Sequence, residues 1–501
     1  MIFFLSNGFF ITKICINFAR FFIFRFVFDS MITFFLALLS LILGYVFYGK
    51  FVERVFGPLN RRTPALKVND GVDYIPMPWW KVFMVQFLNI AGTGPIFGAI
   101  MGAKFGTSAY LWIVLGCIFA GATHDYLSGM ISLRNKGISY PDIIGKYLGN
   151  RTKKAMLLFT ILLLIMVGAV FVYSPAIILS GLIGDFMMWA VIIFMYYFIA
   201  TMMPIDKIIG KIYPVFAFAL MFMAVAMLVA LVIKMPDLPE IWEGLENKNP
   251  KMGPVVPILF ITIACGAISG FHATQSPLMS RCVKHEKLGL PVFYGAMITE
   301  GIVALIWATV ASYFFYGGGA AELGADISSS APQIVNIVSE SWLGVVGSVL
   351  ALLGVVAAPI STGDTAMRSA RLIIADFIHL DQKRIRNRLA ISVPLFLVTI
   401  LVLWFNIADE DGFNVIWNYF GWANQTLSVF TLWAITVYLV KERKPFVITL
   451  IPALFMTGVC STFLLISPIA FGLSETISYG IGGCILIVAS SWFFSWYRKN
   501  K

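Results

Sequence analysis

The chain carries very little charge for its length of 501 residues. Asp, Glu, Lys and Arg together make up 12% of the sequence, whereas apolar residues make up 59%. An ordinary soluble domain has about 25% charged residues, so this composition excludes that class of protein. The mean hydropathy of +0.88 supports the same conclusion. The sequence is therefore that of an integral membrane protein, in contact with membrane lipid.

Signatures of enzymes and of metal sites are also missing. The sequence has four histidines, and its six cysteines are scattered without a CxxC pair. Most of these cysteines lie in or beside apolar segments, which indicates small core residues rather than a disulfide frame or a metal site. No HExxH, GxSxG or Walker sequence occurs. The sequence predicts no enzyme activity, no cofactor and no metal site.

Apolar segments of membrane-spanning length dominate the chain. About 20 apolar residues cross a bilayer. Thirteen segments approach or exceed that length, namely 31–49, 82–103, 108–132, 155–180, 186–203, 212–233, 257–280, 290–316, 343–365, 389–407, 413–440, 445–467 and 474–496. The sequence thus predicts an all-α protein with about thirteen spans.

The net charge of +11 arises from basic residues in short loops between these segments, so it does not indicate nucleic-acid binding. Every second loop is basic, namely 50–81, 133–154, 281–289, 366–388, 441–444 and the tail 498–501. The alternate loops are acidic or short, including 234–256, 317–342 and 408–412. The positive-inside rule then predicts that the basic loops and the C-terminus are cytoplasmic.

Two of the thirteen segments are interrupted near their middles. Residues 82–103 contain Ala91–Pro95, and residues 257–280 contain a polar, glycine-rich stretch between Cys265 and Pro277. Irregular backbone survives at membrane depth only inside protein or along a water-filled cavity. Matching interruptions in two halves are typical of the binding site of a secondary transporter. The two segments run in opposite directions and start five spans apart, which indicates an inverted repeat.

This order of elements resembles the leucine-transporter-like fold, in which two five-helix inverted repeats each begin with a broken helix. The resemblance implies a leading helix and cytoplasmic loop, the two repeats, and two trailing helices with a cytoplasmic tail, at residues 31–81, 82–233, 257–440 and 445–501. Residues 1–30 are Phe-rich and basic and lack a small-residue cleavage site before Met31. We interpret them as an annotation extension upstream of a start at Met31, or alternatively as a basic segment on the membrane surface.

Five motifs follow one another along the chain. They are Asp70–Pro76 (DGVDYIP), Ala91–Pro95 (AGTGP), Gly121–Tyr126 (GATHDY), Ser269–Pro277 (SGFHATQSP) and Ser361–Ser369 (STGDTAMRS). Together they resemble the carbon starvation protein A family of bacterial inner-membrane transporters. The resemblance implies import of peptides under carbon starvation, or alternatively of pyruvate, another small carboxylate or an amino acid. It also implies coupling to H⁺, with Na⁺ as the alternative.

The two interruptions supply the candidate substrate-binding residues. Gly92, Thr93 and Gly94 expose N–H groups at the start of a half-helix, where the partial positive charge suits a substrate carboxylate. Close helix packing is the alternative role for these glycines. The second interruption contributes polar groups at membrane depth, from Ser269, His272 and Gln275. His272 also suits a coupling proton, or alternatively a neutral hydrogen bond to a neighbouring helix.

The candidate coupling site lies near the end of segment 343–365. Asp364 with the hydroxyls of Ser361, Thr362 and Thr365 forms an oxygen-rich group suited to Na⁺, or to a carboxylate that takes up H⁺. In the resembling fold this helix shares a cation site with the first broken helix. The alternative is an ion pair between Asp364 and Arg368, one turn away.

His124 and Asp125 close the third predicted span. We expect Asp125 to form a gate ion pair with a basic loop residue, or alternatively to anchor the interface. A metal site is not expected there, because no second His or Cys stands at ligand spacing. A nutrient sensor without transport is the candidate from another class. It would need a signalling domain, for which no loop is long enough.

Overall fold

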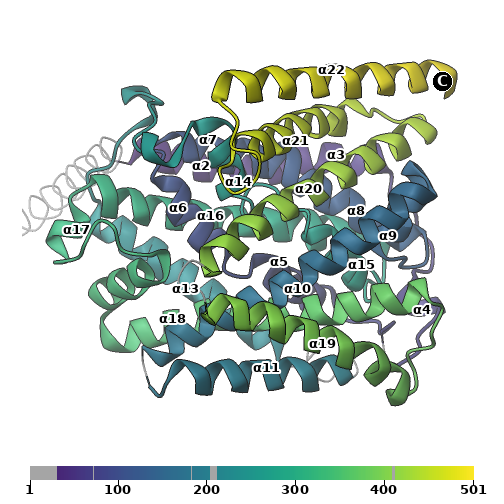
Figure 1. The fold of residues 1–501 in the computed structure, drawn as a ribbon, viewed down its shortest axis with the longest axis horizontal. Coiled ribbons are helices and arrows are strands. Elements are labelled where there is room, and N and C mark those ends of the chain that lie inside the picture. The colour runs from purple at the N-terminus through teal and green to yellow at the C-terminus, as the bar shows by residue number, and fades with distance from the viewer. Residues whose placement is uncertain (1–30, 72, 182, 204–211, 409–411, 501) are drawn as a thin grey trace, which may run out of the picture.

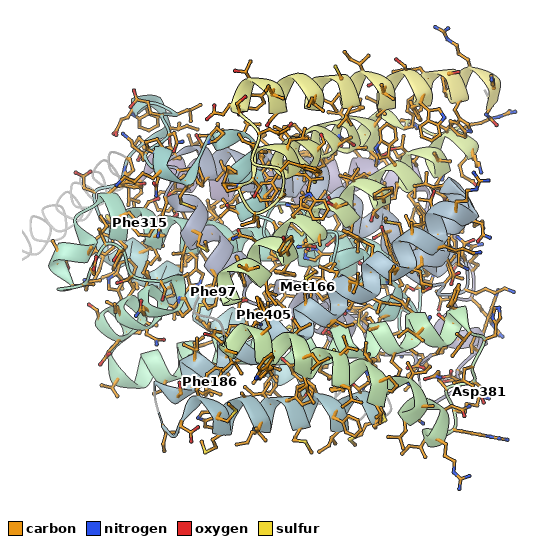
Figure 2. All side chains as sticks on the ribbon, viewed as in Figure 1. Phe97, Met166, Phe186, Phe315, Asp381 and Phe405 are labelled. Atoms are coloured by element: carbon orange, nitrogen blue, oxygen red, sulfur yellow. The ribbon has the colours of Figure 1, made fainter. Side chains whose placement is uncertain are left out.

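The computed structural model describes residues 31–71, 73–181, 183–203, 212–408 and 412–500, and these residues form helices without any strand. Residues 1–30, for which the sequence suggested an annotation extension or a surface segment, lie outside the described residues. Side chains fill the spaces between the helices, and Phe97 and Met166 lie near the middle of the bundle in Figure 2. The all-α class predicted from the apolar segments is confirmed.

The first half of the chain begins with a continuous helix made of three stretches, α2 (Ile32–Leu43), η1 (Gly44–Gly49) and α3 (Lys50–Phe56). The elements that follow are α4 (Pro64–Lys67), α5 (Trp79–Ala91), η2 (Gly94–Gly98), α6 (Ala99–Ala103), α7 (Ser108–Leu115), η3 (Gly116–Gly121), α8 (Ala122–Arg134), α9 (Tyr140–Leu148), α10 (Asn150–Ser180), α11 (Phe186–Met202) and α13 (Tyr213–Lys234).

The second half begins after two short 3₁₀ turns, η4 (Ile241–Glu243) and η5 (Pro250–Met252). Its elements are α14 (Val255–Thr262), α15 (His272–Ser280), η6 (Glu286–Leu288), η7 (Leu290–Tyr294), α16 (Gly295–Tyr316), α17 (Gly319–Glu322), α18 (Ala331–Phe377), α19 (Ile385–Ala408), α20 (Gly412–Lys441), α21 (Val447–Ile466) and α22 (Glu475–Asn500). α18 is interrupted at Gly344, whose φ of +66° is left-handed and marks the place where the sequence predicted span 343–365 to begin.

Within the described residues, nine helices are long and apolar enough to cross a membrane. A tenth crossing is added when α5 and the stretch Gly94–Ala103, which meet at a bend of 52°, are taken as one span. These helices identify a multi-pass membrane protein. The remaining predicted spans, 186–203, 257–280 and 343–365, correspond to α11, to the pair α14 and α15, and to part of α18. They do not satisfy the same criteria, so the total of thirteen stays a prediction.

Helices distant in sequence pack together around the two interrupted spans. α18 packs against both α13 and α10, and α5 contacts α13, α16 and α18. Figure 1 shows α10 crossing the middle of the bundle, with α21 and then α22 along one edge. The division into two repeats with two trailing helices stays a prediction.

The alternate loops gather at two separate places. Glu286 accepts a hydrogen bond from the Leu59 amide at 2.8 Å and lies 3.2 Å from Arg134, so it joins three of the predicted cytoplasmic loops. The acidic loops meet elsewhere, because Lys234 of loop 234–256 pairs with Glu322 of loop 317–342 at 3.5 Å. Glu240 of the first of these loops also accepts the amide of Thr33 at 2.7 Å, at the start of the leading helix. Figure 1 shows α17 and α4 at opposite sides of the molecule.

We expect residues 134–154 and 366–388 to face the cytoplasm and residues 234–256 to face outward, because Lys and Arg concentrate in the first two ranges. The measurement is labelling of an engineered cysteine in intact cells with a membrane-impermeant maleimide. A cysteine within 234–256 should react, and one within 366–388 should react only after the membrane is permeabilised. The reverse pattern would contradict the orientation, and labelling of both sites from the same side of the membrane would contradict the inverted-repeat assignment.

Candidate functional site

The first interruption is a sharp change of backbone direction. α5 ends at Ala91, Gly92 has φ +51° and ψ −143°, and η2 begins at Gly94. The left-handed φ explains the glycine at position 92, since L side chains rarely adopt it. Gly94 faces the second interruption so closely that a Cβ placed on it would lie 2.3 Å from the Cβ of Cys265. The two interruptions are therefore in direct contact in the middle of the protein.

The second interruption separates α14 from α15 by residues 263–271 and is held in place by α20. Asn424 of α20 accepts hydrogen bonds on its side-chain oxygen from the Ser269 hydroxyl at 3.0 Å and from the Phe271 amide at 2.6 Å. Its backbone carbonyl accepts from the Gly270 amide at 3.2 Å. One residue thus satisfies polar groups that the break leaves open, as irregular backbone at membrane depth requires.

A fully buried group of ionisable side chains lies beside this break. Asp125 of α8 contacts His124 Nδ1 through Oδ1 and His272 Nδ1 through Oδ2, each at 2.8 Å. Nε2 of His272 lies 3.5 Å from Oε2 of Glu300, which projects from α16. All four side chains have 0% exposure. Elements from both predicted repeats therefore meet in one ionisable cluster at the core.

Several buried polar atoms near the two breaks have no hydrogen-bond partner among the described residues. They include both side-chain polar atoms of Asn89, Oγ1 of Thr93 and Oε1 of Gln275. A buried donor or acceptor left without a partner costs about 1–3 kcal/mol. Such atoms are available to a bound ligand. Gln275 also donates to the Thr274 hydroxyl at 2.9 Å and to the Ser369 hydroxyl at 3.4 Å, which connects the second break to α18.

The predicted coupling residues lie on α18 against the first break. The Thr362 hydroxyl donates to the carbonyl of Leu88 in α5 at 3.1 Å. Asp364 is fully buried; its Oδ2 accepts a hydrogen bond from the Tyr213 hydroxyl, and its Oδ1 has no partner among the described residues. The Ser361 and Thr365 hydroxyls donate to carbonyls of α18 itself. The expected packing of this helix on the first broken helix is present.

The alternative pairing of Asp364 with Arg368 is not found. The Arg368 guanidinium donates instead to the carbonyl oxygens of Ala200 and Met203 at the end of α11. Among the described ion pairs, none joins Arg368 to Asp364. Arg368 therefore holds the last turn of α11 and makes no ion pair with Asp364.

The prediction for His124 and Asp125 needs correction. The helix does not close there, because α8 continues to Arg134 and both side chains are buried. Asp125 pairs with two histidines rather than with a basic loop residue, as described above. The interface-anchor alternative fails for the same reason. The observed pairing could not be predicted from sequence position, since His272 lies 147 positions away from Asp125.

Three residues of this region were not singled out from the sequence: Glu300, Asn424 and Tyr213. Glu300 had a usable signal, because it is an acidic residue within an otherwise uncharged span and such residues are rare and functional. Asn424 and Tyr213 had none, since the sequence does not show which distant helix receives the hydrogen bond of an amide or a phenol. Their roles depend on which distant segment packs against them.

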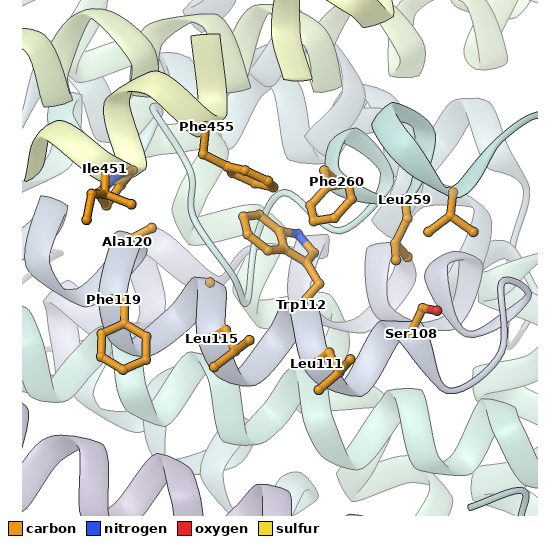
Figure 3. Close-up of a pocket in the computed structure, with 13 residues that line it drawn as sticks. Ser108, Leu111, Trp112, Leu115, Phe119, Ala120, Leu259, Phe260, Ile451 and Phe455 are labelled. Atoms are coloured by element: carbon orange, nitrogen blue, oxygen red, sulfur yellow. The ribbon is translucent and has the colours of Figure 1, made fainter. Parts of the chain in front are cut away.

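An apolar groove on the described part of the chain is a different feature. It has a volume of about 540 Å³ and lies between α7, η3, α14 and α21. Figure 3 shows Trp112, Phe260 and Phe455 gathered at its centre. No charged side chain lines it, so it suits lipid hydrocarbon rather than a charged substrate.

The fold is similar to that of solved transporters. A mutant of the manganese transporter of Eremococcus coleocola superposes with a TM-score of 0.55 at 12% sequence identity. The alignment covers 87% of this chain and 99% of that chain. The likeness confirms the predicted leucine-transporter-like fold.

Sequence relatives extend the comparison. An uncharacterized membrane protein of Haemophilus influenzae is 44% identical over 340 residues, covering 57% of this chain and 91% of that protein. A Campylobacter jejuni protein named peptide transporter CstA is 31% identical over 366 residues, covering 58% of this chain and 52% of that protein. An Escherichia coli protein named pyruvate/proton symporter BtsT is 25% identical over 338 residues, covering 54% and 47%. The chain thus spans about half the length of these two named transporters.

The model of the family described as carbon starvation protein CstA matches residues 29–185, 172–342 and 316–463. These overlapping matches include all five motifs as well as both interrupted spans and the helix that carries Asp364. The chain belongs to the carbon starvation protein CstA family.

Proposed function

We propose that this protein is an ion-coupled secondary transporter that imports peptides under carbon starvation. The observation that carries the proposal is the direct contact of the two interrupted spans, where Gly94 meets Cys265. Helix breaks that face each other at the middle of an inverted repeat are where transporters of this architecture hold substrate. The Campylobacter relative named peptide transporter CstA supports peptides as the substrate class.

In this proposal the substrate carboxylate lies at the start of η2. The N–H groups near Thr93 and Gly94 carry the partial positive charge of a helix N-terminus. The unpaired atoms of Asn89, Thr93 and Gln275 supply further hydrogen bonds to the substrate. Ser269 and His272 contribute mainly by fixing the second break, because both already have partners within the protein.

The coupling ion is proposed to act at Asp364, with Ser361, Thr362 and Thr365 around it. A buried carboxylate without an arginine partner favours uptake of H⁺, and the surrounding hydroxyls and carbonyls make Na⁺ the alternative. The ion shifts the equilibrium between inward-open and outward-open states only if it binds one of them more tightly. Thr362 bonds to Leu88 beside the first break, so binding of an ion at Asp364 can affect the conformation of that break.

Pyruvate is the second candidate substrate, since the Escherichia coli relative is named pyruvate/proton symporter BtsT. Both substrates present a carboxylate to the same helix start. The site is proposed to lie in a bacterial inner membrane, with the C-terminus in the cytoplasm. No enzymatic role is proposed, since the relatives with named functions are transporters.

A competition experiment separates these candidates. Cells that express the protein are given a radiolabelled dipeptide or, in parallel, radiolabelled pyruvate, and unlabelled peptides, pyruvate or amino acids are added at varied external pH and Na⁺. Peptides should compete and uptake should rise as the pH falls. Uptake of pyruvate without uptake of the dipeptide would assign the alternative substrate, and absence of uptake of either label would favour a sensor.

A further inference from the structure

We propose that Cys265, His272 and Glu300 form a binding site for a divalent transition-metal ion of the zinc class. Their ligand atoms, one from each side chain, all lie within 4.8 Å of one another. The three residues come from the second break, from the start of α15 and from α16. A bound ion would tie the break to α16 at the centre of the protein.

Two of the three ligand atoms are buried and free of hydrogen bonds. His272 Nε2 and Glu300 Oε2 each have no hydrogen-bond partner among the described residues, and both side chains have 0% exposure. They lie 3.5 Å apart, too far for a good hydrogen bond. Zinc–ligand bonds of about 2.0–2.3 Å in a tetrahedron place neighbouring ligand atoms roughly 3.3–3.6 Å apart. The spacing therefore fits two ligands that share one ion.

The surroundings hold these ligands in the required state. Asp125 Oδ2 lies 2.8 Å from His272 Nδ1, so the ring donates from Nδ1 and directs the lone pair of Nε2 toward Glu300. Metal-bound histidines characteristically donate their other nitrogen to a carboxylate in this way. The second oxygen of Glu300 accepts the Gly266 amide at 3.1 Å, which fixes the carboxylate.

The ligand types select the class of ion. A set of one sulfur, one nitrogen and one oxygen suits Zn²⁺ and similar transition metals, whereas Mg²⁺ and Ca²⁺ prefer oxygen alone. Three protein ligands leave a fourth position, as in zinc sites that also bind water or substrate. Cys265 packs against Gly94, so this position would be near the junction of the two breaks. No metal site is predicted from the sequence because these residues show no recognisable ligand spacing along the chain.

The test measures metal in the purified full-length chain, prepared in detergent with a tag that contains no histidine. After incubation with Zn²⁺ and removal of free ion, we expect about one Zn²⁺ per chain by mass spectrometry. Loading with Co²⁺ should give visible ligand-field bands and a thiolate-to-cobalt charge-transfer band. Cys265→Ser should abolish the charge-transfer band and Glu300→Gln should weaken binding, whereas Cys460→Ser, a change of another buried cysteine, should alter neither.

A variant outside the ligand set tests the site without changing any of the three ligands. Asp125→Asn keeps the shape of the side chain but removes the charge behind His272, and should weaken binding by about 10- to 100-fold. Substoichiometric metal in the loaded wild-type protein would overturn the proposal. Metal retained equally by Cys265→Ser, Glu300→Gln and Asp125→Asn would be adventitious and would overturn it too. Because metal content is measured without transport, this result is separate from the test of peptide uptake.

Discussion

Replacing Gly94 with leucine is expected to reduce substrate uptake to near background while the protein still inserts in the membrane. A Cβ at this position would lie 2.3 Å from the Cβ and 2.4 Å from the Sγ of Cys265, so the two breaks must separate to admit any side chain. Overpacking of this kind costs about 1–3 kcal/mol. That cost corresponds to about a 5- to 150-fold shift in a conformational equilibrium, and leucine should lie at the upper end.

The matched control for this change is Gly480→Leu in α22. A Cβ at Gly480 meets nothing within 4 Å, so the same chemical change should leave uptake unaltered. Uptake of a labelled peptide and the amount of protein in the membrane fraction are measured for both variants. If Gly94→Leu transports at the wild-type rate, the substrate does not pass the junction of the two breaks.

Asp364→Asn is expected to abolish accumulation of substrate against a gradient but to spare exchange of substrate across the membrane. Asparagine keeps the size of the side chain and can still accept the hydrogen bond from Tyr213, but it carries no charge and takes up no proton. The internal-to-external substrate ratio should fall to about one, because an ion that no longer distinguishes the two states cannot drive transport.

Asp381→Asn is the control for this substitution, since Asp381 is an exposed residue after the end of α18 and lies at the periphery in Figure 2. It should accumulate substrate as the wild-type protein does. Accumulation in proteoliposomes under an imposed pH gradient, with counterflow measured in parallel, gives both quantities. Should Asp364→Asn still concentrate substrate, coupling would have to be sought in the cluster of Asp125, His272 and Glu300.

Features with a local cause were predictable from the sequence. Gly92 and Gly94 predict the first break, because glycine and proline beside a polar residue disrupt a membrane helix. The polar run from Ser269 to Gln275 predicts the second break for the same reason. The contact of Thr362 with Leu88 was also within reach, because the inverted repeat places the two helices side by side.

Features that depend on tertiary packing were not predictable. Asp125 looked like the end of a helix, yet its partner His272 belongs to another span and both lie in the core. Asn424 supports the second break through contacts that its own neighbours in sequence do not indicate. Arg368 binds the end of α11 rather than Asp364. This partner depends on how different helices pack together, and the spacing of residues along one helix cannot predict it.

We propose that the two breaks form the substrate site of an ion-coupled carrier. The measurement that tests it most directly is uptake of a labelled dipeptide by proteoliposomes containing only this protein. With the interior alkaline relative to the exterior, we predict accumulation above the external concentration and its collapse when a protonophore removes the gradient. For the Na⁺ alternative, an inward Na⁺ gradient and a Na⁺ ionophore take their places. Equal internal and external concentrations with and without the gradient would contradict the account.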